Sequence, residues 1–121
     1  MNSGLRILLV DDEPMIIASV GRFLRLQHYE TVTCMDGQEA LQRAQAERFD
    51  VVIADFDLPS LQGLSLLCQL RPHMPDALLV LASGSSSMEP PVRAAGEDIV
   101  FLAKPFDLES LLAIIRIAMK C

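Results

Sequence analysis

The chain has 121 residues, of which 51% are hydrophobic and 5% aromatic, and it contains no tryptophan. This length suits one domain with one packed core, expected over residues 1–121, and so few aromatic side chains argue against a platform for base stacking. Sixteen acidic against ten basic residues give a net charge of -6, and the basic residues are scattered, which argues against direct binding of nucleic acid or an anionic membrane.

Five short aliphatic runs predict five β-strands, because each is followed by a polar or turn-rich segment. Several runs are apolar on both faces, as the strands of a parallel sheet covered by helices on both sides must be. In chain order, the expected strands are residues 6–10, 31–34, 51–54, 77–82 and 99–103.

Helical patterns lie between these strands. Pro14 is suited to the first position of a helix that runs to about Leu26, and Gly21 inside that helix predicts a close packing contact. Asp36 is expected to cap a second helix. A third is expected over residues 64–71.

The last expected helix begins after Asp107, a suitable N-cap, and carries Arg116 and Lys120 near its C-terminal end, where the macrodipole favours basic residues. Strands and helices therefore alternate along the chain. Such an order predicts a doubly wound α/β fold, in which right-handed crossovers place helices on both faces of a five-stranded parallel sheet.

Acidic residues follow two of the expected strands. Asp11 and Asp12 come after the first strand, and Asp55 and Asp57 come at the end of the third. The carboxyl ends of parallel strands meet at one edge of a sheet, where ligands of such folds bind. Carboxylates crowded together repel one another, and hard oxygen ligands in this number suit Mg²⁺. The sequence therefore predicts a magnesium site at this edge.

Two further polar residues belong to the same edge. Ser83 follows the fourth strand, and Lys104 follows the fifth and precedes Pro105. A lysine and a hydroxyl beside a metal provide the positive charge and the hydrogen-bond donor that a phosphoryl group requires. We interpret the edge as a site for phosphoryl transfer.

With these residues in order, the chain resembles a two-component response-regulator receiver domain over essentially its whole length. The matching features are the acidic pair after the first strand, Asp55, "DLP" with Gly63 beyond it, Ser83, and "LAKPFD" near the end. The resemblance implies a flavodoxin-like sheet with strand order 2-1-3-4-5. It also implies a cis peptide bond before Pro105.

The resemblance further implies a role for each site residue. A sensor histidine kinase or a phosphotransfer protein would phosphorylate Asp55, and a downstream output protein or domain would respond. The chain would then be a phosphoacceptor module and not an enzyme. Mg²⁺ would be bound by Asp11, Asp12, Asp55 and the backbone carbonyl of Asp57. Ser83 and Lys104 would bind the phosphoryl group, and Ser83 with Phe101 would form the conformational switch, although Phe101 also suits a plain core position.

One segment departs from the family pattern. Receiver domains usually carry a regular fourth helix where this chain has "GSSSMEPPVR", with Pro90 next to Pro91. Because proline disrupts helix interiors, we expect a short or irregular fourth helix. The last helix, "LESLLAIIRIAM", is more apolar than one buried face requires, and it could pack on a second copy of the chain as a homodimer or lie crowded against the sheet.

Two alternative functions remain. The D-x-D of Asp55 and Asp57 is also the signature of aspartate-nucleophile phosphatases of the haloacid-dehalogenase type, but in those the motif follows the first strand. The altered fourth-helix segment would also suit a receiver-like interaction module that no longer uses phosphate.

The cysteines and the apolar runs indicate the cellular compartment. Cys34, Cys68 and Cys121 form no Cys-x-x-Cys pair, which argues against a disulfide framework and a zinc site. The apolar run near the start is too short for a signal peptide, and no run reaches the length of a membrane span. We therefore expect a cytoplasmic protein.

Overall fold

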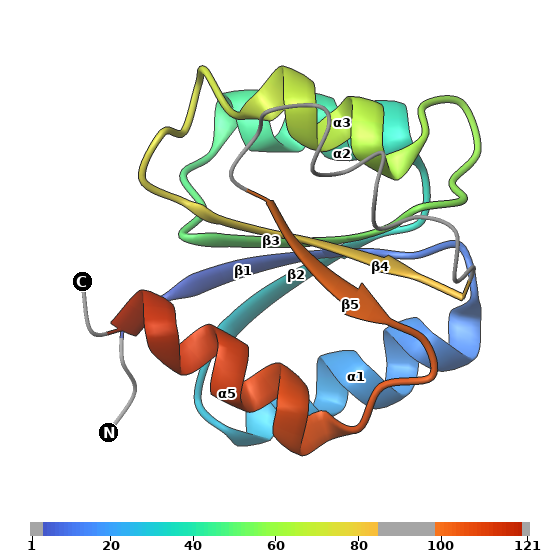
Figure 1. Cartoon of the computed structure of the whole chain (residues 1–121). Helices are drawn as coiled ribbons and strands as arrows, with labels where there is room; N and C mark the ends of the chain where they lie inside the picture. Colours follow the sequence, from blue (N-terminus) through green and yellow to red (C-terminus); the bar gives the residue numbers. More distant parts are fainter. Residues whose placement is uncertain (1–3, 85–98, 120–121) are drawn as a thin grey trace.

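The computed structural model of the chain describes residues 4–84 and 99–119 (Figure 1). All five expected strands and the four expected helices outside residues 85–98 are present. The short or irregular fourth helix is predicted for a segment that lies outside the described residues. The elements are β1 (Arg6–Val10), α1 (Pro14–Leu26), β2 (Glu30–Cys34), α2 (Gly37–Ala46), β3 (Val51–Asp55), α3 (Gly63–Leu70), β4 (Leu78–Ser83), β5 (Ile99–Ala103) and α5 (Leu108–Met119).

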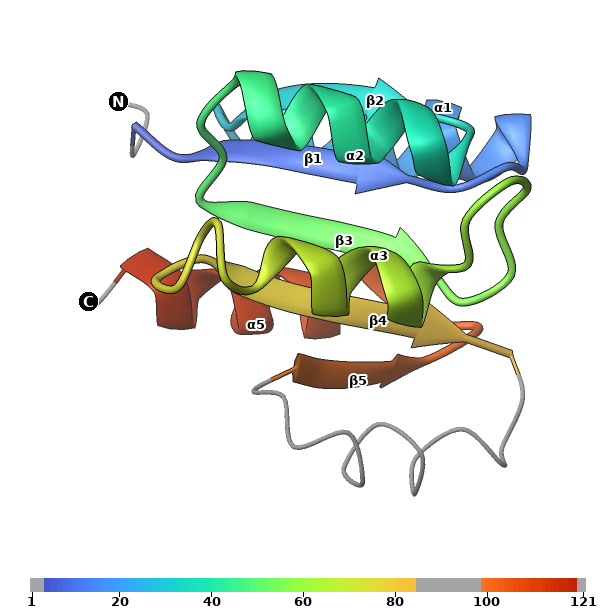
Figure 2. The same ribbon diagram turned by 90° about the horizontal axis from the view of Figure 1, so that it is seen from above.

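The five strands form one parallel sheet in the order β2-β1-β3-β4-β5. Helices α2 and α3 cover one face of this sheet, while α1 and α5 cover the other (Figures 1 and 2). The predicted doubly wound fold and its flavodoxin-like strand order are confirmed. The carboxyl ends of all five strands lie at one edge, as parallel pairing requires.

Each central strand contributes side chains to both apolar layers. In β1, Leu8 and Val10 belong to the layer under α2 and α3, whereas Ile7 and Leu9 belong to the layer under α1 and α5. All four side chains are at most 2% exposed. Since successive side chains point to opposite faces, burial on both faces explains why the strand sequences are continuously apolar.

The expected helix caps are present. The Asp36 carboxylate accepts a hydrogen bond of 3.0 Å from the backbone N–H of Glu39, and the Asp107 carboxylate accepts one from the N–H of Ser110. These bonds satisfy N–H groups that have no partner within the first helical turn. Asp36 and Asp107 therefore fix where α2 and α5 begin.

The prediction of a close packing contact at Gly21 in α1 is wrong. A Cβ atom added to Gly21 would lie 3.5 Å from Arg25 and 3.6 Å from Thr33, which is ordinary van der Waals contact. Close backbone contacts occur instead at Gly37, where a Cβ atom would collide with the carbonyl of Leu61, and at Gly63, where it would collide with the carbonyl of Asp55. Gly37 allows α2 to begin directly against the loop that follows β3, and Gly63 allows α3 to begin directly against the end of β3.

Cys34 is expected to resist alkylation until the protein unfolds. Its side chain is 2% exposed, and burial raises the pKa of the thiol to about 11, so about one thiol in a thousand is ionised at pH 8. Peptide mapping after iodoacetamide treatment at pH 8 should find the half-buried Cys68 modified and Cys34 intact, with both modified in denaturant. Equal labelling of the two thiols in the native protein would contradict this expectation.

Candidate functional site

Three of the predicted metal ligands come together at the carboxyl edge of the sheet. Because β1 and β3 are paired neighbours, with Val10 opposite Ala54, the residues that follow them lie side by side. Asp11 is 3% exposed and Asp55 8% exposed, whereas Asp12 is exposed. One carboxylate oxygen from each of these three residues lies within 4.8 Å of the other two.

Lys104 joins this acidic group from the end of β5, the outer strand two places from β3 in the sheet. Its ammonium nitrogen lies 2.9 Å from Asp11 Oδ2 and 3.0 Å from Asp55 Oδ1. The backbone N–H of Lys104 donates a 2.8 Å hydrogen bond to the carbonyl of Ser83, the last residue of β4. This bond holds Lys104 beside the end of β4. The peptide bond between Lys104 and Pro105 is cis, as the family resemblance implies.

The electrostatic surroundings shift the pKa values of both partners in this ion pair. Burial raises the pKa of Asp55; the hydrogen bond and the charge of Lys104 oppose this effect, and the charges of Asp11 and Asp12 add to it. Burial lowers the pKa of Lys104, but its hydrogen bonds to Asp11 and Asp55 outweigh burial and raise the pKa overall. Lys104 therefore carries a full positive charge at neutral pH.

The donor set of the site fits a hard divalent cation. Three carboxylates and one ammonium leave two uncompensated negative charges when all four groups are ionised. Such a group repels itself and attracts a cation of charge +2. Mg²⁺ prefers oxygen ligands and takes one or a few carboxylates while keeping several waters. The residues present could therefore hold Mg²⁺.

Ser83 and Phe101 lie where the sequence predicts, on neighbouring strands. Ser83 is the last residue of β4 and is 2% exposed. Phe101 lies in β5 opposite Leu81, is partly buried, and packs against the apolar layer under α2 and α3. This packing is compatible with both interpretations of Phe101, so its role as a switch residue stays a prediction.

In the absence of metal, Asp55→Asn is expected to stabilise the fold. A carboxyl whose pKa is raised on folding makes the native state bind protons more tightly, so stability falls as pH rises from the unfolded to the folded pKa. An asparagine does not ionise, so the variant keeps the stability that the wild type loses above the folded-state pKa of Asp55. The side-chain oxygen of the asparagine can still accept a hydrogen bond from Lys104. In EDTA at pH 7 we expect a melting temperature several degrees higher, since 1 kcal/mol corresponds to about 4 °C.

The difference between wild type and Asp55→Asn should shrink as the pH is lowered into the carboxylate range. Added Mg²⁺ should in turn stabilise the wild type more than the variant. A ligand that binds the native state raises the free energy of unfolding in proportion to the logarithm of its affinity, and the variant has lost one of the carboxylates. A variant that melts at or below the wild-type temperature in EDTA at pH 7 would contradict the assigned effect of burial.

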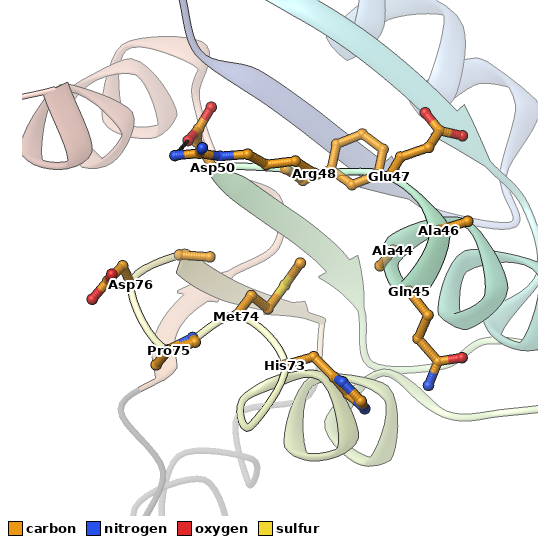
Figure 3. Close-up of a pocket in the computed structure, with 12 residues that line it drawn as sticks. Ala44, Gln45, Ala46, Glu47, Arg48, Asp50, His73, Met74, Pro75 and Asp76 are labelled. Carbon is orange, nitrogen blue, oxygen red and sulfur yellow. Dashed lines mark ion pairs between the residues drawn. The ribbon is translucent and has the colours of Figure 1, made fainter.

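Among the hollows in the described part of the chain, two lie at opposite edges of the sheet. One, of about 570 Å³, lies beside the acidic site and is lined by Lys104 and Glu13 together with apolar residues of α1 and α5. The other, of about 450 Å³, lies between the α2–β3 and α3–β4 connections, with Arg48, Asp50 and His73 among its lining residues (Figure 3). None of the predicted site residues lines the second hollow.

The sequence analysis missed the residues that hold the loop between β3 and α3. Ser60 in this loop is hydrogen bonded to Asp36, the cap of α2, at 2.8 Å. The sequence identifies Asp36 as a cap, but no local pattern links it to a serine 24 positions later. The signal in the sequence is that Ser60 lies three positions after the expected metal ligand at Asp57.

Comparisons with known proteins agree with this site. Residues 7–116 match the family model described as "Response regulator receiver domain". The transcriptional regulatory protein PrrA of Mycobacterium bovis is 37% identical over an alignment of 121 positions, which covers 96% of this chain and 52% of that protein. The chain thus spans about half the length of such relatives.

Solved structures show the same fold. A response regulator receiver domain protein (CheY-like) from Methanospirillum hungatei has a TM-score of 0.87 and 29% identity, with 96% of this chain and 94% of that chain covered. The response regulator TrrA of Thermotoga maritima, solved in complex with Mg²⁺ and BeF, has a TM-score of 0.85 and 29% identity, with 94% and 98% covered.

No helix in residues 4–84 and 99–119 combines the length and apolar character that a membrane crossing would need.

The family match covers the strands, the acidic cluster and Lys104, and the relatives exceed 30% identity over most of the chain. The chain belongs to the response regulator receiver domain family of two-component systems.

Proposed function

We propose that Asp55 accepts a phosphoryl group from the phosphohistidine of a sensor kinase or a phosphotransfer protein, and that this changes the affinity of the chain for a downstream partner. The observation that carries the proposal is the position of the Asp55 carboxylate. It is nearly buried at the end of β3, within one cluster with two other carboxylates, and 3.0 Å from the Lys104 ammonium. This environment suits a nucleophile whose product is a doubly charged phosphoryl group.

In the proposed reaction, an oxygen of the Asp55 carboxylate forms a bond to phosphorus while the bond between phosphorus and the donor imidazole nitrogen breaks. The electron pair of the broken bond remains on the imidazole, which takes up a proton. Lys104 donates to a phosphoryl oxygen and compensates its charge, and the Ser83 hydroxyl is a second donor. Bound Mg²⁺ supplies further positive charge to the phosphoryl oxygens.

Several features support Mg²⁺ as the cofactor. Asp11, Asp12 and Asp55 offer carboxylate oxygens within 4.8 Å of one another. The backbone carbonyl of Asp57 is the fourth proposed protein ligand. The Thermotoga TrrA structure, 29% identical to this chain, was solved in complex with Mg²⁺ and BeF.

The output of the signal is proposed to depend on a further domain or protein. Residues 1–121 form one phosphoacceptor module in this proposal, with self-phosphorylation and autodephosphorylation as its only chemistry, and we place it in the cytoplasm. PrrA carries the description of a transcriptional regulatory protein and is about twice as long as the matched segment. No observation within the described residues favours the haloacid-dehalogenase alternative.

Incubation with acetyl phosphate or phosphoramidate and Mg²⁺, followed by intact mass measurement, tests the proposal. We expect the mass to increase by one phosphoryl group, and we expect EDTA to prevent the increase. The modification should disappear on standing or under alkaline hydroxylamine, because an acyl phosphate is labile. Absence of any phosphoryl gain in a folded protein with Mg²⁺ present would overturn the proposed function.

A further inference from the structure

The loop between β3 and α3, residues 56–62, carries Asp57, whose backbone carbonyl is a proposed Mg²⁺ ligand. Both ends of this loop are fixed by backbone hydrogen bonds. The N–H of Phe56 donates to the carbonyl of Ala82 at 2.7 Å, and the N–H of Gly63 donates to the carbonyl of Phe56 at 3.0 Å. The middle of the loop extends from the sheet toward the start of α2 (Figure 2).

The first turn of α2 holds the middle of the loop through three hydrogen bonds. The Ser60 hydroxyl donates to Asp36 Oδ1 at 2.8 Å and accepts from the backbone N–H of Gln38 at 3.1 Å. The N–H of Gly37 donates to the carbonyl of Pro59 at 3.1 Å. Asp36 Oδ1 therefore serves both the helix cap and the loop, and these hydrogen bonds lower the pKa of the Asp36 carboxyl.

Backbone packing adds a steric restraint to these hydrogen bonds. Gly37 is buried, and a Cβ atom at this position would collide with the carbonyl and the side chain of Leu61. Ser60 adopts a φ of 66°, a left-handed backbone conformation that residues other than glycine seldom take without a local hydrogen-bond partner. The loop is thus held in one shape by contacts with α2.

We infer that Asp36, Gly37 and Ser60 form a latch that positions the β3–α3 loop, and with it the backbone carbonyl of Asp57, for a divalent cation. The inference rests on the proposed function, because it concerns the same metal site. The latch residues touch neither the cation nor the phosphoryl group in this scheme. They act as positioning residues, through the shape of the loop.

The test is the affinity for Mg²⁺ alone, measured by amide NMR titration of the whole chain, in wild type and three variants. Ser60→Gly removes the hydroxyl, while glycine suits the φ of 66° and the Asp36 cap of α2 is retained. Asp36→Ala removes both the cap and the loop contact. Asp36→Asn retains an oxygen that can accept from both Glu39 and Ser60.

We expect Ser60→Gly, which loses the hydrogen bonds of the hydroxyl to Asp36 and Gln38, to bind Mg²⁺ about fivefold more weakly than wild type. Its melting temperature in EDTA should be no lower than that of wild type. Asp36→Ala should bind Mg²⁺ equally weakly and also melt earlier, while Asp36→Asn should restore the affinity. This separation of affinity from stability distinguishes positioning from a general loss of structure.

Unchanged Mg²⁺ affinity in Ser60→Gly would overturn the latch, as would an affinity loss that only accompanies a lower melting temperature. Measuring the phosphoryl gain of the wild type in parallel distinguishes failure of the latch from failure of the proposed function. A wild type that is phosphorylated and binds Mg²⁺, beside a Ser60→Gly variant of equal affinity, would overturn the latch alone. A wild type that binds no Mg²⁺ would overturn both.

Discussion

No phosphoryl group is expected on the Asp55→Ala variant after incubation with acetyl phosphate and Mg²⁺, whereas the wild type should gain one. The variant loses the proposed nucleophile and also one of the three clustered carboxylates. It keeps Asp11 and Asp12, so the site still attracts cations but contains no carboxylate at the end of β3. Intact mass measurement of the folded proteins side by side gives the result directly.

Asp57→Asn is the matched control for this experiment, because it changes a carboxylate two residues away and keeps the backbone carbonyl. The group of close carboxylate oxygens contains Asp55 but not Asp57, whose side chain is exposed. Asp57→Asn should gain the phosphoryl group as wild type does. A phosphoryl gain that survives Asp55→Ala, or one that is lost in Asp57→Asn, would contradict the assignment.

The exposed charge of Asp57 is expected to affect how long the phosphoryl group persists. Its side chain is exposed two positions after Asp55, and a negative charge there can influence the approach of water or of the phosphoryl donor. We therefore expect the dephosphorylation half-life of Asp57→Asn to differ from that of wild type, measured by intact mass after removal of the donor. Equal half-lives would remove this role for the Asp57 side chain.

The fold could be predicted from the sequence because its signals are local. Runs such as residues 6–10 and 51–54 are apolar on both faces, and the structure buries them between two helical layers. Pro14 and Asp36 mark the starts of α1 and α2 at the predicted positions. Once the strands are parallel and the order is known, the acidic residues must meet at one edge.

The restraints on the loop after β3 could not be predicted, because they join residues that are distant in the sequence. The contact of Ser60 with Asp36 and the close approach of Gly37 to Leu61 depend on how α2 and the loop meet across the sheet edge. Gly21 shows the converse error. A glycine within a helix predicts close packing, yet its neighbours leave room for a methyl group. Sequence alone does not show which glycine has a backbone neighbour.

Replacing Lys104 with methionine is expected to move two properties of the site in opposite directions. Lys104 bonds to both Asp11 and Asp55, so it competes with Mg²⁺ for their oxygens. Without the ammonium, the three carboxylates should bind Mg²⁺ more tightly, about tenfold for a coupling of about 1.4 kcal/mol. Phosphoryl uptake should nevertheless slow by about 10²–10³, the usual cost of losing one donor to developing charge.

The combination of tighter metal binding with slower phosphorylation separates the two roles of Lys104. If the lysine only held the fold together, Lys104→Met would weaken metal binding and slow phosphorylation together. Lys104→Arg is the matched control, since it keeps the positive charge but replaces a compact ammonium by a planar fork, and it should leave Mg²⁺ affinity near that of wild type. NMR titration with Mg²⁺ and the rate of mass gain from acetyl phosphate measure the two quantities independently. Weaker Mg²⁺ binding in Lys104→Met would show that the lysine orders the carboxylates more than it competes for them.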